Sequence, residues 1–459
     1  MHAATRNRGG SLALDRDTIA AVATAPGRGG IGVVRISGAQ ARAVAAALVG
    51  RLPAARRAAV RNFRDAQGVA VDQGVVLFFE GPASFTGEDV VELQGHGGPV
   101  VLDLLLEAAL AAGARMARPG EFTERAYLNG RIDLAQAEAV ADLIASGSRA
   151  GVRSAMRSLS GEFSTRIDAL ANGLAELRLH VEAAIDFPEE EIDFLADSNV
   201  RERIRRLHRE LADLTTRARQ GALQNEGMSV VIAGRPNAGK SSLLNRLAGY
   251  DRAIVTAIPG TTRDTLAERI LLDGLPLRIV DTAGLRRTDD PVEQEGVRRA
   301  RTELAQADRI LLVCDASTGE DPIGIAREEQ LPLERLTVVL NKIDIAALGS
   351  GEDTDRTPPC VRVSALTGAG FDVLAQHLKA AAGWRDDEGA FSARRRHLDA
   401  LRRAGELIEH GLAELETHSA AELLAEDLRL AHDALGEIVG HVSSDDLLGR
   451  IFASFCIGK

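Results

Sequence analysis

The sequence predicts a multidomain protein that combines mixed α/β, all-α and doubly wound α/β parts. With 459 residues, the chain is too long for one ordinary domain. Short β-branched runs dominate residues 18–115, and helical periodicity dominates residues 121–223. Strands then alternate with helices over residues 228–382, before the helical pattern returns. We therefore expect a mostly parallel sheet domain inserted into a helical domain.

The expected boundaries follow these changes of pattern. In the first part, the runs TIAAVAT, IGVVRIS, QGVVLFFEG and EDVVELQG predict strands, and residues 99–113 predict a helix that ends at Gly113. The segments are 1–118 for the N-terminal α/β domain, 119–223 and 384–459 for the two parts of the helical domain, and 224–383 for the inserted domain.

Composition excludes several classes of protein. Aromatic residues are only 3% of the chain, and its formal net charge is −11, so it lacks the rings and the overall charge of a general single-strand binder. Basic stretches at 201–210, 296–309 and 392–404 are typical of solvated helix faces, with RNA contact as the other interpretation. No apolar run approaches the ~20 residues that cross a bilayer, so we expect no membrane partner.

The cysteines indicate the compartment. Cys314, Cys360 and Cys456 are far apart and form no CxxC pair, which argues against a disulfide framework or a cysteine-based zinc site. This usage predicts a reducing compartment, and we expect a cytoplasmic protein.

The glycine run at 27–32, GRGGIG, matches the dinucleotide-binding pattern only formally. The residues after it predict a strand rather than a helix, and no acidic residue follows before Arg64 to hold a ribose hydroxyl. We reject a Rossmann site here and expect a glycine-rich turn between strands.

The strongest motif is GRPNAGKS at 234–241, which follows an apolar strand and precedes a helical pattern. This context is that of a P-loop, in which backbone N–H groups and the helix N-terminus face phosphates. Lys240 would add a cation, and the Ser241 hydroxyl would bind Mg²⁺. Downstream, Asp281 ends a second apolar strand and is expected to hold Mg²⁺ through water, while Gly284 leaves the backbone free to reach a γ-phosphate.

A third strand ends in the sequence NKID and predicts the base specificity. The Asp344 carboxylate can accept hydrogen bonds from guanine N1–H and N2–H₂, and adenine has no amino group at that position. Asn341 and Lys342 belong to the same motif, and Ser364 and Ala365 would close over the base. The inserted domain is therefore predicted to bind GTP.

The residue after DTAG raises a question about hydrolysis. Ras-like GTPases carry a glutamine there that orients the attacking water, whereas Leu285 can neither donate nor accept a hydrogen bond. Another group must place the water. The loop 256–264 is the candidate switch, with Thr262 as its Mg²⁺ ligand. Three arginines compete for the role of an arginine finger and none is assigned: Arg263, Arg286 and Arg287.

Several motifs together resemble one known family. Asn237 in the P-loop, PGTTRD in the switch, FTGEDVVELQGHGGP at 85–99, ARPGEFTERAYLNGRIDLAQAEAVADLI at 117–144 and the terminal FCIGK are similar to the tRNA-modification GTPase family MnmE, also called TrmE. The resemblance covers the chain from about Asp17 to Lys459. It implies an N-terminal folate-binding and dimer-forming domain, a helical domain and an inserted Ras-like P-loop GTPase domain.

The resemblance also implies how GTP is hydrolysed. The GTPase domains would dimerise and use K⁺ held by Asn237, Thr256, Ile258 and Thr261, in place of an arginine finger. Glu293 would position the water, with an exposed switch residue as its other interpretation. Nucleotide contacts by motif match are Asn237, Ala238, Gly239, Lys240, Ser241, Ser242, Thr256, Ala257, Ile258, Pro259, Gly260, Thr261, Thr262, Asp281, Thr282, Ala283, Gly284, Asn341, Lys342, Asp344, Ser364 and Ala365.

For the family, the implied reaction installs an aminomethyl-type group at C5 of the wobble uridine of certain tRNAs. A 5-formyl- or methylene-tetrahydrofolate would supply the carbon, and a flavin-dependent MnmG/GidA-type subunit would join the homodimer in a heterotetramer. The matching folate positions are Arg35, Glu92, Arg131 and Lys459, with surface salt bridges as the other interpretation of Glu92 and Arg131.

The C-terminal FCIGK has two interpretations. Cys456 is either a reactive thiol delivered to folate and tRNA or a small buried hydrophobe, and its chemical role stays undecided. Phe455 is expected to anchor the tail by packing. Gly458 and Lys459 do not fit a prenylation signal.

Two other functions compete with a tRNA-modifying GTPase. A ribosome-assembly or RNA-binding GTPase switch should carry basic flanks and RNA-binding motifs, and neither a convincing KH-type signal nor an RNP1 run is found. A folate-dependent transferase that uses GTP only for regulation differs in where the chemistry occurs.

Overall fold

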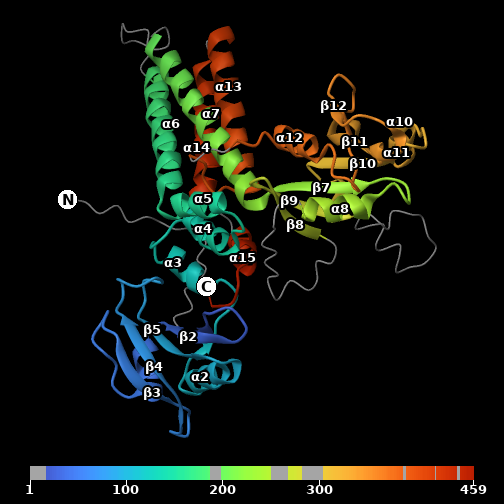
Figure 1. The fold of residues 1–459 in the computed structure, drawn as a ribbon. Coiled ribbons are helices and arrows are strands. Elements are labelled where there is room, and N and C mark those ends of the chain that lie inside the picture. Colours follow the sequence, from blue (N-terminus) through green and yellow to red (C-terminus); the bar gives the residue numbers. More distant parts are fainter. Residues whose placement is uncertain are drawn as a thin grey trace. The chain divides into compact units, whose positions relative to one another are not determined.

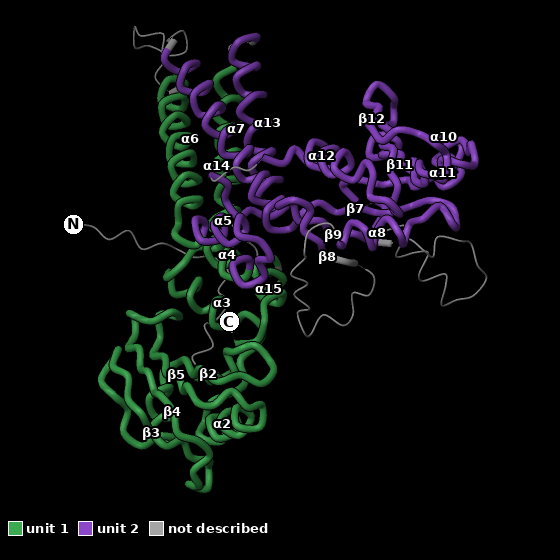
Figure 2. Tube along the Cα trace, in the orientation of Figure 1, with its two compact units in different colours: residues 1–141, 159–188, 420–459 green, residues 142–158, 189–419 purple. Residues whose placement is uncertain are grey.

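The computed structural model (Figure 1) describes residues 17–186, 198–249, 267–281, 303–305, 307–385, 389–418, 420–441 and 445–458. The chain divides into two compact units, and each unit is built from separate stretches of sequence (Figure 2). Unit 1 contains residues 1–141, 159–188 and 420–459, and unit 2 contains residues 142–158 and 189–419.

Unit 1 begins with a six-stranded sheet of order β3-β4-β5-β2-β1-β6, antiparallel except for the β1–β6 pair. Its core lies between the sheet and helices α1 and α2, where alternate strand residues such as Val91 and Leu93 are buried. The elements are β1 (Ile19–Val22), β2 (Gly29–Ser37), α1 (Ala41–Val49), β3 (Ala59–Arg64), β4 (Ala70–Phe79), β5 (Val90–Gly97), α2 (Pro99–Ala111) and β6 (Arg115–Met116).

The four strands predicted for this region are present as β1, β2, β4 and β5. The predicted helix is α2, and Gly113 follows it with φ of +108°, donating its N–H to Leu110. The prediction of a turn at 27–32 is wrong for most of that run, because β2 already begins at Gly29 and pairs with Gly97. Glycines at this end of the β2–β5 pair permit close strand contact, since a Cβ on Gly97 would collide with the Ile31 carbonyl.

The rest of unit 1 is helical. The long helices α6 and α14 pack along each other, and α15 packs on α3. Phe455 is buried with Leu134 and Phe452, which confirms its role as a packing anchor. The helices are α3 (Glu121–Leu128), α4 (Leu134–Ala145, of which the last residues fall in unit 2), α6 (Glu162–Asp186), α14 (Ala421–Val439) and α15 (Asp445–Ala453).

Unit 2 holds a seven-stranded sheet of order β12-β13-β11-β10-β7-β9-β8, whose central strands are parallel and whose edge strands β8 and β12 are antiparallel. Separate apolar cores lie on its two faces, as in a doubly wound sheet. The strands are β7 (Met228–Ala233), β8 (Ala267–Leu272), β9 (Leu275–Asp281), β10 (Arg309–Asp315), β11 (Leu336–Asn341), β12 (Gly351–Asp353) and β13 (Cys360–Arg362).

The helices of unit 2 fall into two groups. Within the sheet domain lie α8 (Lys240–Ala248), α10 (Pro322–Glu328), α11 (Ile343–Ala346) and α12 (Phe371–Ala382). Beside them are α5 (Arg149–Leu159), α7 (Ser198–Glu226) and α13 (Arg395–His418), of which α7 and α13 pack together. The predicted fold class is therefore confirmed: a mixed α/β N-terminal part, an all-α part and an inserted, mostly parallel sheet domain.

The root of the inserted domain is held by α7. The Gln220 amide donates to the Gly383 carbonyl at 2.6 Å and accepts from the Arg385 N–H at 2.9 Å. The next residue, Gly221, lies so close to the Phe391 backbone that a Cβ would collide with the Phe391 carbonyl. The chain thus leaves the helices and returns to them at one place, which is the arrangement that an insertion requires.

A buried ionic network stabilises unit 1. Arg125, 3% exposed, donates to Asp17, to Glu88 at 3.1 Å and to Glu121 at 3.0 Å. Arg115 donates to Glu121 at 2.6 Å and also pairs with Asp17. Burial would raise the pKa of Glu121, but hydrogen bonds led by that from Arg115 outweigh it and lower the pKa to about 2.

Replacing Arg125 with methionine removes the cation that Asp17, Glu88 and Glu121 share, and leaves Glu88 without this buried ion pair. We expect Arg125→Met to lower the free energy of unfolding by about 3–5 kcal/mol. The matched control is Arg118→Met, because Arg118 is 57% exposed and its ion pairs should contribute less than about 1 kcal/mol. Urea unfolding followed by circular dichroism compares them, and equal shifts of the two variants would contradict this account.

Candidate functional site

The P-loop lies between β7 and α8, as predicted. Gly234 has φ of +137° and lies against the Val313 carbonyl, where a Cβ would collide, so glycine is required there. Asn237 and Gly239 also adopt positive φ, at 62° and 94°. The Lys240 ammonium donates across the loop to the carbonyls of Gly234 and Arg235, at 2.8 and 2.9 Å. The loop therefore curls around the N-terminus of α8, where free N–H groups suit an anion.

The residues expected at the phosphates lie at the same edge of the sheet. Ser241 and Ser242 are exposed in the first turn of α8. Asp281 is the last residue of β9, which runs parallel to β7 with Ile232 opposite Asp281. Parallel strands end at one edge of a sheet, and ligands of such sheets bind there.

The base-binding motif is joined to the P-loop by one side chain. Asn341, 2% exposed, donates from Nδ2 to the Ala238 carbonyl at 3.0 Å, and its Oδ1 accepts from the Ala365 N–H at 3.0 Å. Beside it, the Ser364 hydroxyl donates to Asp344 at 2.6 Å. The structure thus brings three predicted segments together: the P-loop, the NKID sequence and the loop at 364–365.

Several predicted residues lie outside the described residues, and the side chain of Asp281 is among the parts that the structure does not describe. The switch and post-DTAG positions in question are Thr256, Ala257, Ile258, Pro259, Gly260, Thr261, Thr262, Thr282, Ala283, Gly284, Leu285 and Glu293, together with Lys459 at the C-terminus. Their roles stay predictions.

The sequence analysis missed Asp315. This residue ends β10 between the P-loop strand and the NKID strand, and its carboxylate contacts Lys342 at 2.6 Å. An acidic residue at the end of the run RILLVCD was the available signal, because β10 and β11 end at the same edge.

In unit 1 the structure brings two of the predicted folate residues together. Arg35 and Glu92 are cross-strand neighbours on β2 and β5, and their side chains form an ion pair at 2.9 Å. The Arg35 guanidinium also lies over the Phe122 ring, 5.6 Å from its centre. Glu92 therefore does form the salt bridge that was its other interpretation. Both side chains of the pair are about one-fifth exposed.

Arg131 lies beside the segment that follows Phe85. A Cβ on Gly87 would meet the Arg131 side chain at 3.3 Å, and Arg131 itself is exposed. Phe85 lies under the Arg35 guanidinium at 5.9 Å, so residues 85–87 contact both predicted cations. In the parts of the chain that the structure describes, no ion partner is found for Arg131.

The C-terminal tail is fixed to unit 1 by its backbone. The Cys456 carbonyl accepts from Gly120 N–H at 3.3 Å, and Gly458 lies against the Val22 carbonyl of β1. The Cys456 side chain is exposed, so the interpretation as a buried hydrophobe is wrong. Cys314 and Cys360 are buried, and burial raises the pKa of Cys314 to about 12, which makes that thiol unreactive.

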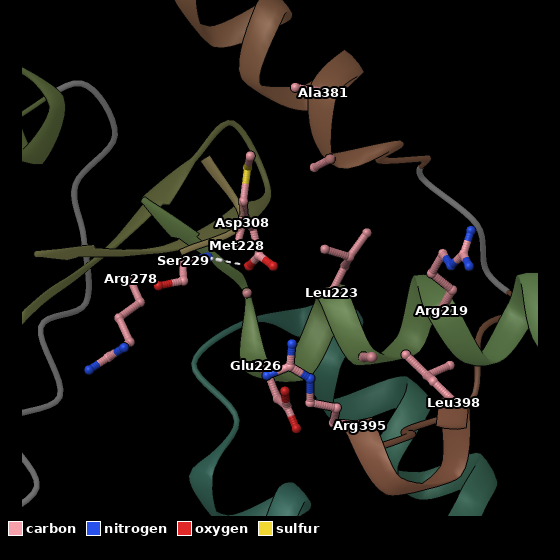
Figure 3. Close-up of a pocket in the computed structure, with 13 residues that line it drawn as sticks. Arg219, Leu223, Glu226, Met228, Ser229, Arg278, Asp308, Ala381, Arg395 and Leu398 are labelled. Atoms are coloured by element: carbon pink, nitrogen blue, oxygen red, sulfur yellow. Dashed lines mark hydrogen bonds between the residues drawn. The ribbon is translucent and has the colours of Figure 1, made fainter. Parts of the chain in front are cut away.

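A pocket of about 530 Å³ lies in unit 2 where α7 passes into β7 (Figure 3). Its charged lining includes Arg219, Glu226 and Asp308, and the Asp308 carboxylate accepts from Ser229 N–H at 2.8 Å. Burial raises the pKa of Glu226. No residue of the nucleotide motifs lines this pocket, so it belongs to the root of the inserted domain rather than to the nucleotide site.

The basic stretches carry many internal ion pairs. Arg205 pairs with Glu416, and Arg209 pairs with Glu202, in the first stretch. In the third stretch, Arg402 pairs with Glu406 on the next turn of α13. These contacts support the interpretation as solvated helix faces, while most of the second stretch lies outside the described residues. Nor does any helix of the described ranges have the length and apolar character to span a bilayer.

The fold and site define the class of protein: a P-loop GTPase domain, with a guanine-binding motif, inserted into a helical domain that also carries an N-terminal α/β domain. Two family models match this arrangement, the MnmE helical domain over residues 134–456 and the GTP-binding protein TrmE N-terminus over residues 18–131.

Curated relatives cover almost the whole chain. The tRNA modification GTPase MnmE of Chromohalobacter salexigens is 58% identical over 97% of this chain and 98% of its own length. That of Stutzerimonas stutzeri is 57% identical, over 97% and 99%. The chain belongs to the MnmE family, and it is a GTPase that acts in tRNA modification. Era of Aquifex aeolicus bound to GDP·AlF4⁻ is 28% identical over 39% of this chain and 66% of its own, but its TM-score of 0.26 is too low to define a shared fold.

Removing the Asn341 side chain should separate the P-loop from the base-binding loop. We expect Asn341→Ala to weaken GTP and GDP binding about a hundredfold, because two hydrogen bonds are lost and the buried Ala238 carbonyl is left without its donor. Asn245→Ala, on the exposed face of α8, is the matched control and should leave affinity unchanged. Titration with a fluorescent GDP measures both, and similar affinities for the two variants would disprove the bridging role.

Proposed function

We propose that GTP hydrolysis in the inserted domain supports modification at C5 of the wobble uridine of certain tRNAs. The product would be a carboxymethylaminomethyl-type group whose one-carbon unit comes from a 5-formyl- or methylene-tetrahydrofolate. The observation that supports this proposal is that one chain of this family carries two separate polar sites: the guanine site in unit 2 and the cluster of Arg35, Glu92 and Arg131 in unit 1.

For hydrolysis, the chain's own residues must hold the phosphates and place a water. Among the described residues, no group of three or more His, Cys, Asp or Glu side chains is arranged to hold a metal ion. Mg²⁺ at nucleotide sites is held by few protein ligands and by the phosphates themselves. Ser241, Thr262 and, through water, Asp281 are proposed as those ligands, with Lys240 facing the phosphates. Bound there, Mg²⁺ would neutralise phosphate charge.

A second cation is proposed to take the place of an arginine finger. Asn237 lies in the P-loop at positive φ and offers a side-chain oxygen, which is a ligand type that K⁺ accepts. Thr256, Ile258 and Thr261 would complete the set when two GTPase domains pair. Glu293 would then orient the water that Leu285 cannot orient. A carboxylate accepts a hydrogen bond from water, and a leucine side chain does not.

We expect hydrolysis to be faster in K⁺ than in Na⁺ at equal ionic strength. In K⁺, Glu293→Ala should reduce turnover by about 10²–10³-fold, the range seen when a group that acts on the transition state is removed, while GTP affinity stays the same. Glu295→Ala, two residues along the sequence, is the matched control. Phosphate release at saturating GTP measures the rate.

Equal rates in the two salts would remove the cation from the proposal. A Glu293→Ala variant that binds GTP poorly but hydrolyses it normally would assign that residue to nucleotide binding instead.

For folate, the unit 1 cluster offers complementary groups. Arg35, Arg131 and Lys459 are cations that suit the glutamate carboxylates of the cofactor, and Glu92 can accept from the N–H groups of a pterin. Arg35 and Gln94 already contact the Glu92 carboxylate, at 2.9 and 3.3 Å. A pterin would therefore bind a carboxylate that these two side chains orient. Cys456, whose side chain is exposed, is proposed as a catalytic thiol.

Arg131→Gln should weaken binding of 5-formyltetrahydrofolate about tenfold without changing thermal stability, because Arg131 is exposed and its charge is not used by any described ion partner. Arg64→Gln, at an exposed position of β3 in the same unit, is the matched control. Isothermal titration calorimetry with the reduced folate measures both. If both variants bind like the unchanged protein, Arg131 does not contact the cofactor.

Further partners follow from the family. We propose a homodimer formed through the N-terminal domain, which joins a flavin-dependent MnmG/GidA-type subunit in a heterotetramer in the cytoplasm. Large apolar side chains exposed on that domain, including Ile31 and Val100, offer the kind of surface that such a contact covers.

A further inference from the structure

Asp315 lies beside the guanine-binding motif without belonging to it. It is the last residue of β10 and pairs with Asn341 across the parallel β11 strand. At this end of the sheet, the Lys342 ammonium donates from Nζ to Oδ2 of Asp315 at 2.6 Å. Asp315 therefore contacts the lysine of the NKID sequence directly.

The carboxylate of Asp315 is itself held in place. Its other oxygen, Oδ1, accepts from the N–H and the hydroxyl of Ser317, at 3.0 and 2.6 Å. The Ala316 N–H donates to the Asn341 carbonyl at 2.9 Å, which ties the two strand ends together. Hydrogen bonds from Lys342 and Ser317 lower the pKa of Asp315 to about 2, so the group is ionised at neutral pH. Each carboxylate oxygen thus has its own donor.

The backbone of Lys342 and the side chains on either side of it are fixed by the fold, so its own side chain is the part of this segment that the Asp315 contact orders. Lys342 adopts φ of +64°, a conformation that side chains rarely take. On one side, Asn341 bridges the P-loop and the loop at 364–365, and on the other, Asp344 accepts from Ser364. The lysine side chain between them is only 30% exposed, and its long stem would otherwise sample many rotamers.

We propose that Asp315 is a positioning residue that presets Lys342, and with it the guanine-binding segment 341–344, before the nucleotide arrives. A side chain that is already ordered loses less conformational freedom on binding, so affinity rises. The contact is made at the base end of the site and not at the γ-phosphate. Asp315 therefore strengthens the binding of GTP and GDP alike and leaves the rate of phosphate cleavage at saturation unchanged.

Asp315→Asn tests this proposal, since asparagine keeps the size and can still accept from Ser317 but has no charge to hold Lys342. We expect the dissociation constants of fluorescent GDP and GTP analogues to rise about tenfold, within the range of ordering one long side chain. The KM for GTP should rise in parallel, while kcat at saturating GTP stays within about twofold.

The matched control is Asp321→Asn, the same chemical change in the same stretch of chain. Asp321 caps α10 by accepting from the N–H groups of Ile323 and Gly324, a role that asparagine also fills. It should bind nucleotide like the unchanged protein. Asp315→Glu, which restores the charge, should recover part of the lost affinity.

A double-mutant cycle separates positioning from a general structural role. If Asp315 acts through Lys342, then Asp315→Asn adds less than about a twofold weakening in a Lys342→Ala background. The proposal is overturned by the full tenfold loss in both backgrounds, by unchanged affinity in Asp315→Asn alone, or by a lower kcat with unchanged KM.

If Asp315→Asn does not fold, Ser317→Ala gives a second test. It removes one donor to the carboxylate and keeps the ion pair, so we expect a two- to threefold loss of affinity in the same direction. An unchanged affinity in that variant would count against the proposal.

Discussion

The nucleotide site depends on one amide side chain. Asn341 donates to a P-loop carbonyl and accepts from a backbone N–H of the loop at 364–365, and it is almost fully buried while doing so. Three loops from distant parts of the sequence therefore share one support. Since a buried amide without partners costs free energy, the loops cannot easily separate. The P-loop and the base-binding loops consequently keep a fixed position relative to each other.

The same domain is firmly attached to its helices. The Gln220 side chain hydrogen-bonds to the backbone of Gly383 and Arg385, where the chain leaves the sheet domain. Gly221 has no side chain, so the returning chain at Phe391 can pack directly on α7. The sheet domain therefore joins α7 directly, and α7 in turn packs on α13. This gives physical meaning to a GTPase inserted into a helical domain rather than attached at the end of a chain.

Most of the nucleotide site could be predicted from the sequence, because the P-loop and NKID motifs bind phosphate and guanine through a few residues at fixed spacing. The sequence also predicted the four main strands of unit 1, whose apolar runs are bounded by turn residues. It failed at GRGGIG, since glycines that permit close strand pairing look the same in sequence as glycines of a turn. Asp315 was missed for a similar reason: its partner Lys342 is adjacent only after β10 and β11 pair. The exposure of Cys456 likewise depends on how the tail meets β1 and α3.

The central claim is that guanine-nucleotide turnover in the inserted domain is needed for the change at the wobble uridine. The most direct test is mass spectrometry of wobble uridines from cells whose only copy of this protein carries Asp344→Asn, with Asp372→Asn at an exposed position of α12 as the matched change. Asparagine presents an amide in place of the carboxylate that accepts from guanine. The account predicts that the C5 modification is lost with Asp344→Asn, as in cells without the protein, and kept with Asp372→Asn. Full modification with Asp344→Asn would contradict it.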